Sequence, residues 1–219
     1  GYGVRTGSYS VNITIVNCMI NSNGYDAGYD AFGVRCANTV NLTIANCTIR
    51  DNGYNTLYGY GVRAEYDAAN LTIVGCTISS NGRNAQTGYG VYCDSIANTT
   101  LVNCTIRDNG GYGVICYGSY GIKVRFCNIL SNTEHGLYND GPTVDARYCW
   151  WGSPEGPEYK EEGDPEDPEE VYGDVLYEPW LRESWTGVDI VPPSVAIAFP
   201  VDNDYLNSTT IRVTWTGGD

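Results

Sequence analysis

The sequence is poor in positive charge. Lysine and arginine together number 12, against 26 aspartates and glutamates, which gives a net charge of −14. A nucleic-acid groove needs a basic footprint, so we expect no nucleic-acid partner. No apolar run approaches the roughly 18 residues that cross a bilayer, so no transmembrane segment is predicted. The start at Gly1 does not resemble a signal peptide and the single methionine is internal, so we expect a mature or excised piece of a longer protein.

A helical pattern is missing as well. No stretch of helix length shows apolar residues at a period of 3.6. Phenylalanine occurs only 3 times and charged residues make up 17%, whereas glycine occurs 27 times and tyrosine 19 times. This composition is typical of short strands joined by glycine and asparagine turns.

The sequence does contain an internal repeat of six units. A motif of the type Asn-Cys-Thr-Ile recurs, with its cysteine at Cys18, Cys47, Cys76, Cys104, Cys127 and Cys149. A second motif of the type Gly-Val-Arg opens each unit, at Gly3, Gly33, Gly61, Gly90, Gly113 and Gly136. A unit of two or three dozen residues with three short strands cannot bury its own apolar face, whereas stacked coils can.

The repeat and its ending resemble the right-handed parallel β-helix repeat family of the pectin-lyase-like superfamily. The resemblance covers about residues 1–182 and rests on Asn-x-Thr-Ile-x-Asn-Cys-Thr-Ile and on the ending Cys149-Trp150-Trp151-Gly152-Ser153-Pro154. That ending is similar to the terminal cap of extracellular members. The resemblance implies an all-β fold, a right-handed parallel β-helix of about six rungs with three short strands per rung. It implies no single activity, because this fold hosts lyases, hydrolases, epimerases and structural surface proteins.

Three segments follow from these patterns. Residues 1–183 are predicted to form the β-helix with its tryptophan-rich cap and an acidic loop, and residues 184–193 a linker. Residues 194–219 contain two alternating strands that resemble the start of an Ig-like domain. Two strands cannot form a sandwich alone, so this segment is either a partial Ig-like domain or a pair of strands donated to a neighbouring subunit.

The cysteines are expected in two inward columns of the stack, the second of which holds Cys36, Cys93 and Cys116. Adjacent rungs place Cα atoms near the lower end of the disulfide range, so a ladder of buried thiols and a set of disulfides both remain open. The candidate pairs are Cys18–Cys47, Cys76–Cys104, Cys127–Cys149 and Cys93–Cys116. Zinc is not expected, because no Cys-x2-Cys spacing exists and the chain has 1 histidine.

Asparagines occupy two kinds of repeat position. The one that ends each rung is predicted to form a hydrogen-bonded ladder, at Asn23, Asn52, Asn81, Asn109 and Asn132. Others lie in N-glycosylation sequons, and we expect at least one of them to carry sugar: Asn12, Asn41, Asn46, Asn70, Asn98, Asn103 and Asn207. A glycan would place the protein outside the cell or on its surface.

A candidate carbohydrate-binding or partner-binding surface lies at the junctions between rungs. The first three junctions carry insertions, at residues 24–31, 53–59 and 82–88, which should form a lip. Four lip tyrosines are suited to stacking on sugar rings or on another subunit: Tyr25, Tyr29, Tyr54 and Tyr58. Beside them, an outward column of Arg5, Arg35 and Arg63 predicts either a surface network with Glu65, Asp26 or Asp30, or a cleft for an anionic polysaccharide.

No catalytic residue is predicted. The motifs of the family's polygalacturonases and a calcium-binding aspartate cluster on the rungs are not evident, and the body carboxylates are expected on different columns: Asp51, Glu65, Asp94 and Asp108. His135 continues an aromatic column made of Tyr2, Phe32, Tyr60, Tyr89 and Tyr112, so a stacking role is favoured over acid–base chemistry.

The stretch 155–183 holds twelve acidic and two basic residues and is interpreted as a solvated loop that leads from the cap to a closing strand over 171–177, with calcium binding as the alternative. No other cofactor is expected. Together these features favour a structural component of an extracellular assembly, such as a surface layer, sheath or filament, that is glycosylated and associates with itself or with neighbouring domains. The alternatives are a carbohydrate-binding module on a cell-surface protein and, less favoured, a polysaccharide lyase or hydrolase.

Overall fold

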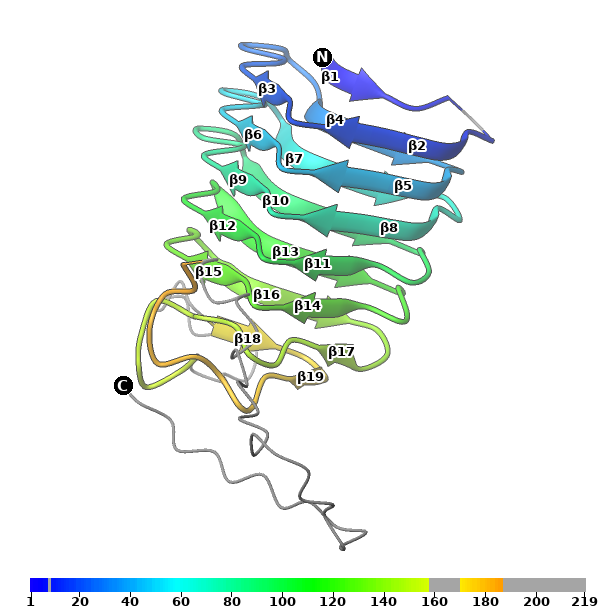
Figure 1. The fold of residues 1–219 in the computed structure, drawn as a ribbon. Coiled ribbons are helices and arrows are strands. Elements are labelled where there is room, and N and C mark those ends of the chain that lie inside the picture. The colour runs from blue at the N-terminus through cyan, green and yellow to red at the C-terminus, as the bar shows by residue number, and fades with distance from the viewer. Residues whose placement is uncertain (8, 158–169, 187–219) are drawn as a thin grey trace, which may run out of the picture. The chain divides into compact units, whose positions relative to one another are not determined.

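The computed structural model describes residues 1–7, 9–157 and 170–186, and the predicted Ig-like segment 194–219 lies outside them. Nineteen short strands form three parallel sheets that wind around one core (Figure 1). Sheet A contains β1 (Tyr2–Arg5), β4 (Ala31–Ala37), β7 (Tyr58–Glu65), β10 (Thr87–Asp94), β13 (Gly111–Tyr117), β16 (His135–Asp140) and β18 (Glu170–Tyr172). Sheet B contains β2 (Val11–Val16), β5 (Val40–Ala45), β8 (Ala69–Val74), β11 (Thr100–Val102), β14 (Lys123–Arg125), β17 (Val144–Asp145) and β19 (Val175–Leu176). Sheet C contains β3 (Met19–Asn21), β6 (Thr48–Arg50), β9 (Thr77–Ser79), β12 (Thr105–Arg107) and β15 (Asn128–Leu130).

Each of the first five rungs contributes one strand to every sheet, which confirms the predicted parallel β-helix with three strands per rung. The sixth rung is β16 and β17, completed by a single bridge between Trp150 and Asn128. Two further strands, β18 and β19, add a partial seventh turn. The sequence predicted only a closing strand over 171–177, because neither repeat motif occurs there.

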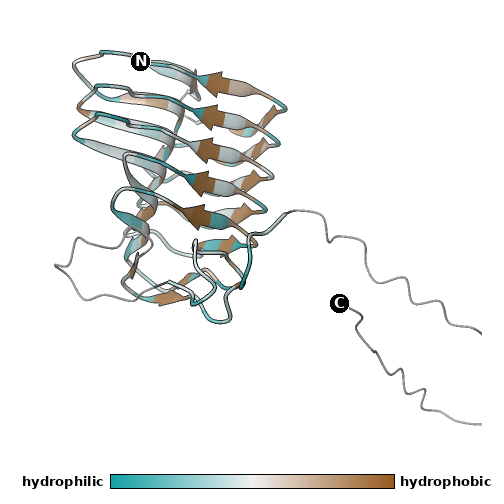
Figure 2. Cartoon of the chain, turned by 90° about the vertical axis from the view of Figure 1, so that its left-hand side faces the viewer, coloured by the Kyte–Doolittle hydropathy of each residue, from teal (hydrophilic) through white to brown (hydrophobic). Residues whose placement is uncertain are grey.

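The core is a stack of identical apolar side chains. Leu42 pairs in register with Leu71, and Ile44 with Ile73. Figure 2 shows the hydrophobic residues recurring at the same place in successive rungs. These side chains are almost completely buried, so each rung hides the apolar surface that the next one would otherwise expose to water.

Glycine redirects the chain in the strands of sheet A. The register passes from Phe32↔Tyr60 directly to Val34↔Val62, so Gly33 and Val34 both face the core. A Cβ at Gly33 would lie 2.7 Å from Ile49 Cγ2, and no larger residue fits there. The aromatic residue before the glycine and the residue after the valine therefore both lie on the outer face of the sheet.

The sixth rung is closed by the segment after β19. Trp151 is completely buried beneath the core, and Leu181 donates its backbone N–H to Cys149. Trp185, at the start of the predicted linker, donates its backbone N–H to Asn128 Oδ1 at 2.6 Å, and its ring packs on Phe126. In the part of the chain described, no helix is present, so none is long and apolar enough to cross a membrane.

The predicted asparagine ladder is confirmed and lies inside the stack. Asn52 Nδ2 donates to Asn81 Oδ1 at 2.9 Å, and the backbone N–H of Asn52 donates to the same oxygen. The pattern repeats from Asn23 to Asn132, and the last four members have no exposed surface. Because the last four amides also donate to a strand carbonyl of a neighbouring rung, the ladder ties successive turns together.

Replacing the central ladder residue should destabilise the whole stack. Asn81→Ala removes the oxygen that accepts two N–H groups of Asn52, and these buried donors are left without a partner. We expect a loss of about 2–3 kcal/mol in the free energy of unfolding, measured by urea denaturation. Asn21→Ala, on the exposed face of β3, is the control and should change stability by less than about 0.5 kcal/mol. Equal losses for the two variants would contradict the ladder's role.

Candidate functional site

The outer face of sheet A carries an aromatic stack along its length. The predicted column of six residues is confirmed: Tyr60 and Tyr89 stack with ring centroids 4.8 Å apart and planes 11° apart. Tyr2, Phe32 and Tyr112 continue the stack on either side. His135 ends it against Tyr112 at 5.6 Å, the ring-stacking place that the repeat assigned to it.

A second outward column runs beside the aromatic stack and changes character along the molecule. Register pairs Arg5, Arg35 and Arg63 in successive rungs, then Tyr92, Ile115, Tyr138 and Tyr172. Ile115 is completely buried on this outer face, in register between Tyr92 and Tyr138, so the rings cover it. Of this column, only the arginines were predicted from the sequence.

The third outward column holds carboxylates. Glu65 follows Ala64, and Asp94 follows Cys93, which pairs with Ala64, so the two acids occupy the same repeat position. The expectation that the body carboxylates fall on different columns was therefore wrong for this pair. It was also wrong for Asp51 and Asp108, which follow Arg50 and Arg107, the two register partners of Ser79. Residues two apart in a strand share a face. Glu65 and Asp94 each stand two positions after Arg63 and Tyr92, which pair in register, so the spacing in the sequence places both acids in one outward column.

Glu65 joins two of the arginines. Its side chain is 1% exposed, and its Oε1 accepts a hydrogen bond from Arg35 Nε at 2.6 Å. Arg63 Nη2 lies 2.8 Å from Oε2, an ion pair without hydrogen-bond geometry, and Arg63 Nη1 lies 3.3 Å from Asp30 Oδ2. Burial lowers the pKa of Arg35, but the hydrogen bond and charge of Glu65 outweigh it and raise the pKa overall. Two of the three expected partners are thus found, whereas Asp26 accepts a hydrogen bond from Asn55 instead.

A groove of about 530 Å³ opens where the arginine column gives way to tyrosine. The tyrosine rings that line the groove differ in whether they present a face or an edge to it. Tyr60 and Tyr89 stack face to face within the column, so they present their edges. The Tyr92 ring stands at 83° to Tyr60 and at 77° to Tyr89. The Tyr58 ring is tilted against Tyr60, and the Tyr117 ring is tilted against Tyr92. The lining residues are Asp30, Tyr58, Tyr60, Arg63, Tyr89, Tyr92, Asp94 and Tyr117.

Three of the groove tyrosines, Tyr60, Tyr89 and Tyr92, are protonated phenols at neutral pH, because their pKa values are raised. Burial raises the pKa of Tyr89 and that of Tyr92 to about 12, with nearby tyrosine and aspartate charges adding to the shift. Burial raises the pKa of Tyr60 in the same direction. Each hydroxyl is therefore available to donate as well as to accept a hydrogen bond.

Of the predicted lip residues, only some meet at this groove. Tyr58 and Arg63 line it. Tyr25 and Tyr54 stack on each other at 4.8 Å, so each covers one face of the other, and Tyr29 is 82% exposed. Tyr60 and Tyr89 were predicted in the aromatic column but not as groove residues. Tyr92 and Tyr117 were missed, although the repeat position that Tyr92 shares with Arg63 was a usable signal.

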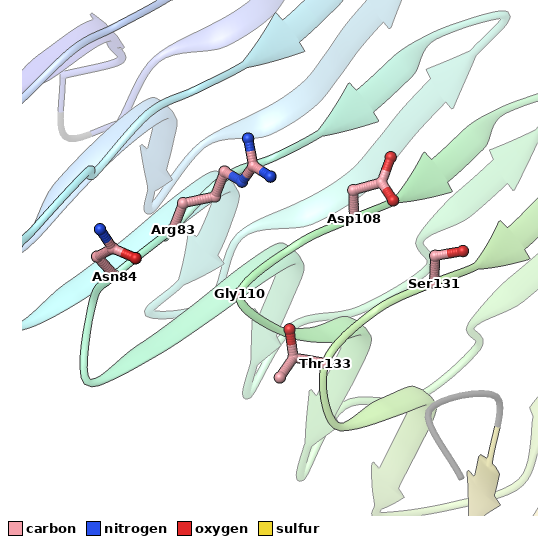
Figure 3. Close-up of a pocket in the computed structure, with 6 residues that line it drawn as sticks. All are labelled: Arg83, Asn84, Asp108, Gly110, Ser131 and Thr133. Atoms are coloured by element: carbon pink, nitrogen blue, oxygen red, sulfur yellow. The ribbon is translucent and has the colours of Figure 1, made fainter.

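A second hollow of about 390 Å³ lies where the insertions end (Figure 3). Arg83 and Asn84 come from the third insertion, and Asp108 and Thr133 come from the shorter turns of the following rungs. Arg107 Nη1 donates to Asp108 at 2.6 Å, and Thr133 donates to the Asn109 carbonyl. No aromatic ring lines this hollow, so it offers hydrogen bonds but no stacking surface.

The six sequons of the repeat lie on the opposite part of the stack, along sheets B and C. Their asparagines stand in left-handed turns at the start of these strands, at Asn12, Asn41, Asn46, Asn70, Asn98 and Asn103. Asn207 lies outside the described residues, as does the central part of the acidic loop, residues 158–169, for which calcium was considered. Among the residues that are described, no group of acids, cysteines or histidine is arranged to hold a metal ion.

The three parallel sheets and the ladders between them define a β-helix of stacked, repeated rungs. Residues 1–92 and 33–150 match the family described as the right-handed beta helix region, and the chain belongs to that family. Comparison with curated proteins and with solved structures gave no match.

All nine cysteines are free thiols in the structure, and eight of them are buried. Register places Cys36 and Cys93 on either side of Ala64, and Cys93 beside Cys116. In the other column, Cys47 Sγ donates to the Ala45 carbonyl at 3.2 Å, and the later members repeat this contact. Burial raises the pKa of Cys36 to about 12. Cys18 Sγ makes the same contact with the Val16 carbonyl at 3.2 Å, as expected for this column, but Cys18 is exposed in the first rung.

This arrangement predicts that one thiol reacts in the folded protein. Iodoacetamide should add a single alkyl group, at Cys18, because the other eight thiols are buried and out of reach of the reagent. After unfolding without reductant, all 9 cysteines should react, as counted by intact mass. A lower count after unfolding would show disulfides among the candidate pairs, and several additions in the native state would show that the columns are open.

Proposed function

We propose that the protein is a non-catalytic module that binds a neutral saccharide chain in the groove on the outer face of sheet A. The observation that carries the proposal is the groove's lining, five tyrosines together with one arginine and two aspartates. Its volume of about 530 Å³ lies within the roughly 300–1,000 Å³ of small-molecule sites.

A sugar ring matches this lining in two ways. Its C–H faces pack on aromatic rings, and Tyr92, turned almost perpendicular to its stacked neighbours, is the ring best placed to take one. Its hydroxyls both donate and accept hydrogen bonds. Phenol hydroxyls, the Arg63 guanidinium and the Asp94 carboxylate supply the matching donors and acceptors.

Charge decides between neutral and acidic saccharides. Arg63 is shared between Glu65 and Asp30, and Arg35 is bound to Glu65, so the two cations already have anionic partners. Asp94 adds a third carboxylate to the same region, and it accepts a hydrogen bond only from Ser95 among the described contacts. A uronate placed in the groove would meet more negative than positive charge, which favours a neutral ligand.

The carboxylates also favour binding over hydrolysis. Glycoside hydrolysis uses two carboxyl groups that flank the scissile bond. Glu65 is sealed between two arginines and Asp30 is paired with one of them, which leaves Asp94 as the one groove carboxylate without an ion pair among the residues described. A groove with one available carboxylate lacks that pair.

Calorimetric titration with neutral and uronate oligosaccharides tests this proposal. We expect saturable binding of a neutral oligosaccharide, weakened at least about 10-fold by Tyr92→Ala, because the stacking surface is lost. Tyr29→Ala, which removes an exposed ring outside the groove, is the matched control and should leave affinity unchanged. Binding of uronates alone, no binding at all, or equal effects of the two variants would contradict the proposal.

A structural part in a glycosylated extracellular assembly is the second candidate, and the continuous ladders favour it. The buried amides and the aromatic stack each run through at least five rungs, so the same interactions hold the body along its length. Such a stack is suited to serve as a rigid spacer between neighbouring domains or subunits. Polymers or sheets in negative-stain images of concentrated protein would support this role. A monodisperse monomer at every concentration in sedimentation would count against it.

A further inference from the structure

Sheet B and the first residues of the sheet C strands share an outer surface without charge over four rungs, and exposed charge returns at the ends of β6 and β12 with Arg50 and Arg107. The stretches 11–20, 40–49, 69–78 and 97–106 contain no acidic or basic residue, although 38 of the 219 residues of the chain are Asp, Glu, Lys or Arg. The fifth rung ends this uncharged surface with Lys123 and Arg125 on β14. All six sequons of the repeat lie on the uncharged surface, in two columns of asparagines.

The first column is closed by hydrogen bonds between its own side chains. Asn41 Nδ2 donates to Asn12 Oδ1 at 2.8 Å, and Asn70 Nδ2 donates to Asn41 Oδ1 at 2.9 Å. Asn98 Nδ2 donates to Asn70 Oδ1 at 3.2 Å. Rungs are about 4.8 Å apart, which is narrower than a sugar ring. A glycan on any of the three donors would therefore meet the next amide of the ladder.

The second column is open. Its members are Asn17, Asn46, Gly75 and Asn103, one per rung, all in left-handed turns. The side-chain amides of Asn46 and Asn103 make no hydrogen bond with any described residue, while their backbone N–H groups are held by the next rung. Gly75 lies between them and has no side chain, and a Cβ there would come within 2.6 Å of Asn46 Oδ1. The two acceptors are therefore two rungs apart, about 10 Å.

We infer that Asn46 and Asn103 are the N-glycan acceptors of this surface, and that Asn41, Asn70 and Asn98 stay unmodified in the folded protein. The inference shares the glycosylating compartment assumed for the second candidate function but does not depend on assembly. The donor class is a lipid-linked oligosaccharide. A bond forms between Nδ2 and the anomeric carbon of the sugar, the bond from that carbon to the phosphate oxygen breaks, and one Nδ2 proton and the lipid diphosphate leave.

Two threonines of β6 and β9 provide a matched pair of variants. Thr48 completes the sequon of Asn46, whereas Thr77 pairs with it in register but follows Gly75 and belongs to no sequon. Both are half-buried at the same repeat position. Thr48→Ala and Thr77→Ala therefore remove the same contacts from the fold, and only the first abolishes an acceptor.

The test is secretion of the full chain from a glycosylating eukaryotic host, with occupancy read site by site after enzymatic removal of the glycans in heavy-oxygen water. We expect label at Asn46 and Asn103, and none at Asn41, Asn70 or Asn98. Thr48→Ala should lower the intact mass by one glycan, and Thr77→Ala should leave it unchanged. Label on Asn41, Asn70 or Asn98 in folded protein, or bare Asn46 and Asn103, would overturn the inference. Because sites are read singly, Asn12, which only accepts in the ladder, and Asn207 do not affect the result, and neither outcome bears on whether the protein assembles.

Discussion

Parallel stacking in register is the constraint on which the rest of the structure depends. Every side chain in the body has as its neighbours the residues at the same repeat position, about 4.8 Å above and below. A residue type is therefore acceptable only if it tolerates its own copy at that distance. Isoleucine and leucine do so inside, asparagine does so by donating to the next oxygen, and aromatic rings do so by stacking face to face.

A charged side chain does not meet this requirement, because it is repelled by its own copy in the next rung. Arginines stacked in three rungs would repel one another, and Glu65 between Arg35 and Arg63 relieves that repulsion. In the fourth rung the column changes to Tyr92 and the carboxylate position continues as Asp94. The groove lies at this change. The candidate site thus lies where the residue types at a repeat position change from one rung to the next, while the positions that do not change keep the rungs in register.

The same distinction explains what the sequence could predict. Positions that repeat, such as Asn81 or Phe32, have neighbours of the same type in the next rung, so the amide ladder and the aromatic stack followed from periodicity. The fold followed from the repeat together with the resemblance to a known family. Positions that vary do not. The column beside the aromatic stack was identified in the sequence by its arginines alone, so Tyr92 was not recognised as the residue that follows Arg63 in it. The strand β18 was predicted only as a closing strand, because neither repeat motif occurs there. The exposure of Cys18 depends on what covers its rung, which a repeat pattern does not specify.

The two sides of the stack therefore suit different tasks. Sheet B presents four nearly identical rungs of asparagine, threonine and small apolar residues, without charge, and such a surface offers no feature that distinguishes one ligand from another. Recognition needs groups of different chemistry at fixed distances. The outer face of sheet A, where arginine, carboxylate and tyrosine replace one another from rung to rung, supplies them. A repeat that is strict in its core can afford such variation outside, because Val34, Val62 and Val91 hold the backbone in the same register beneath it.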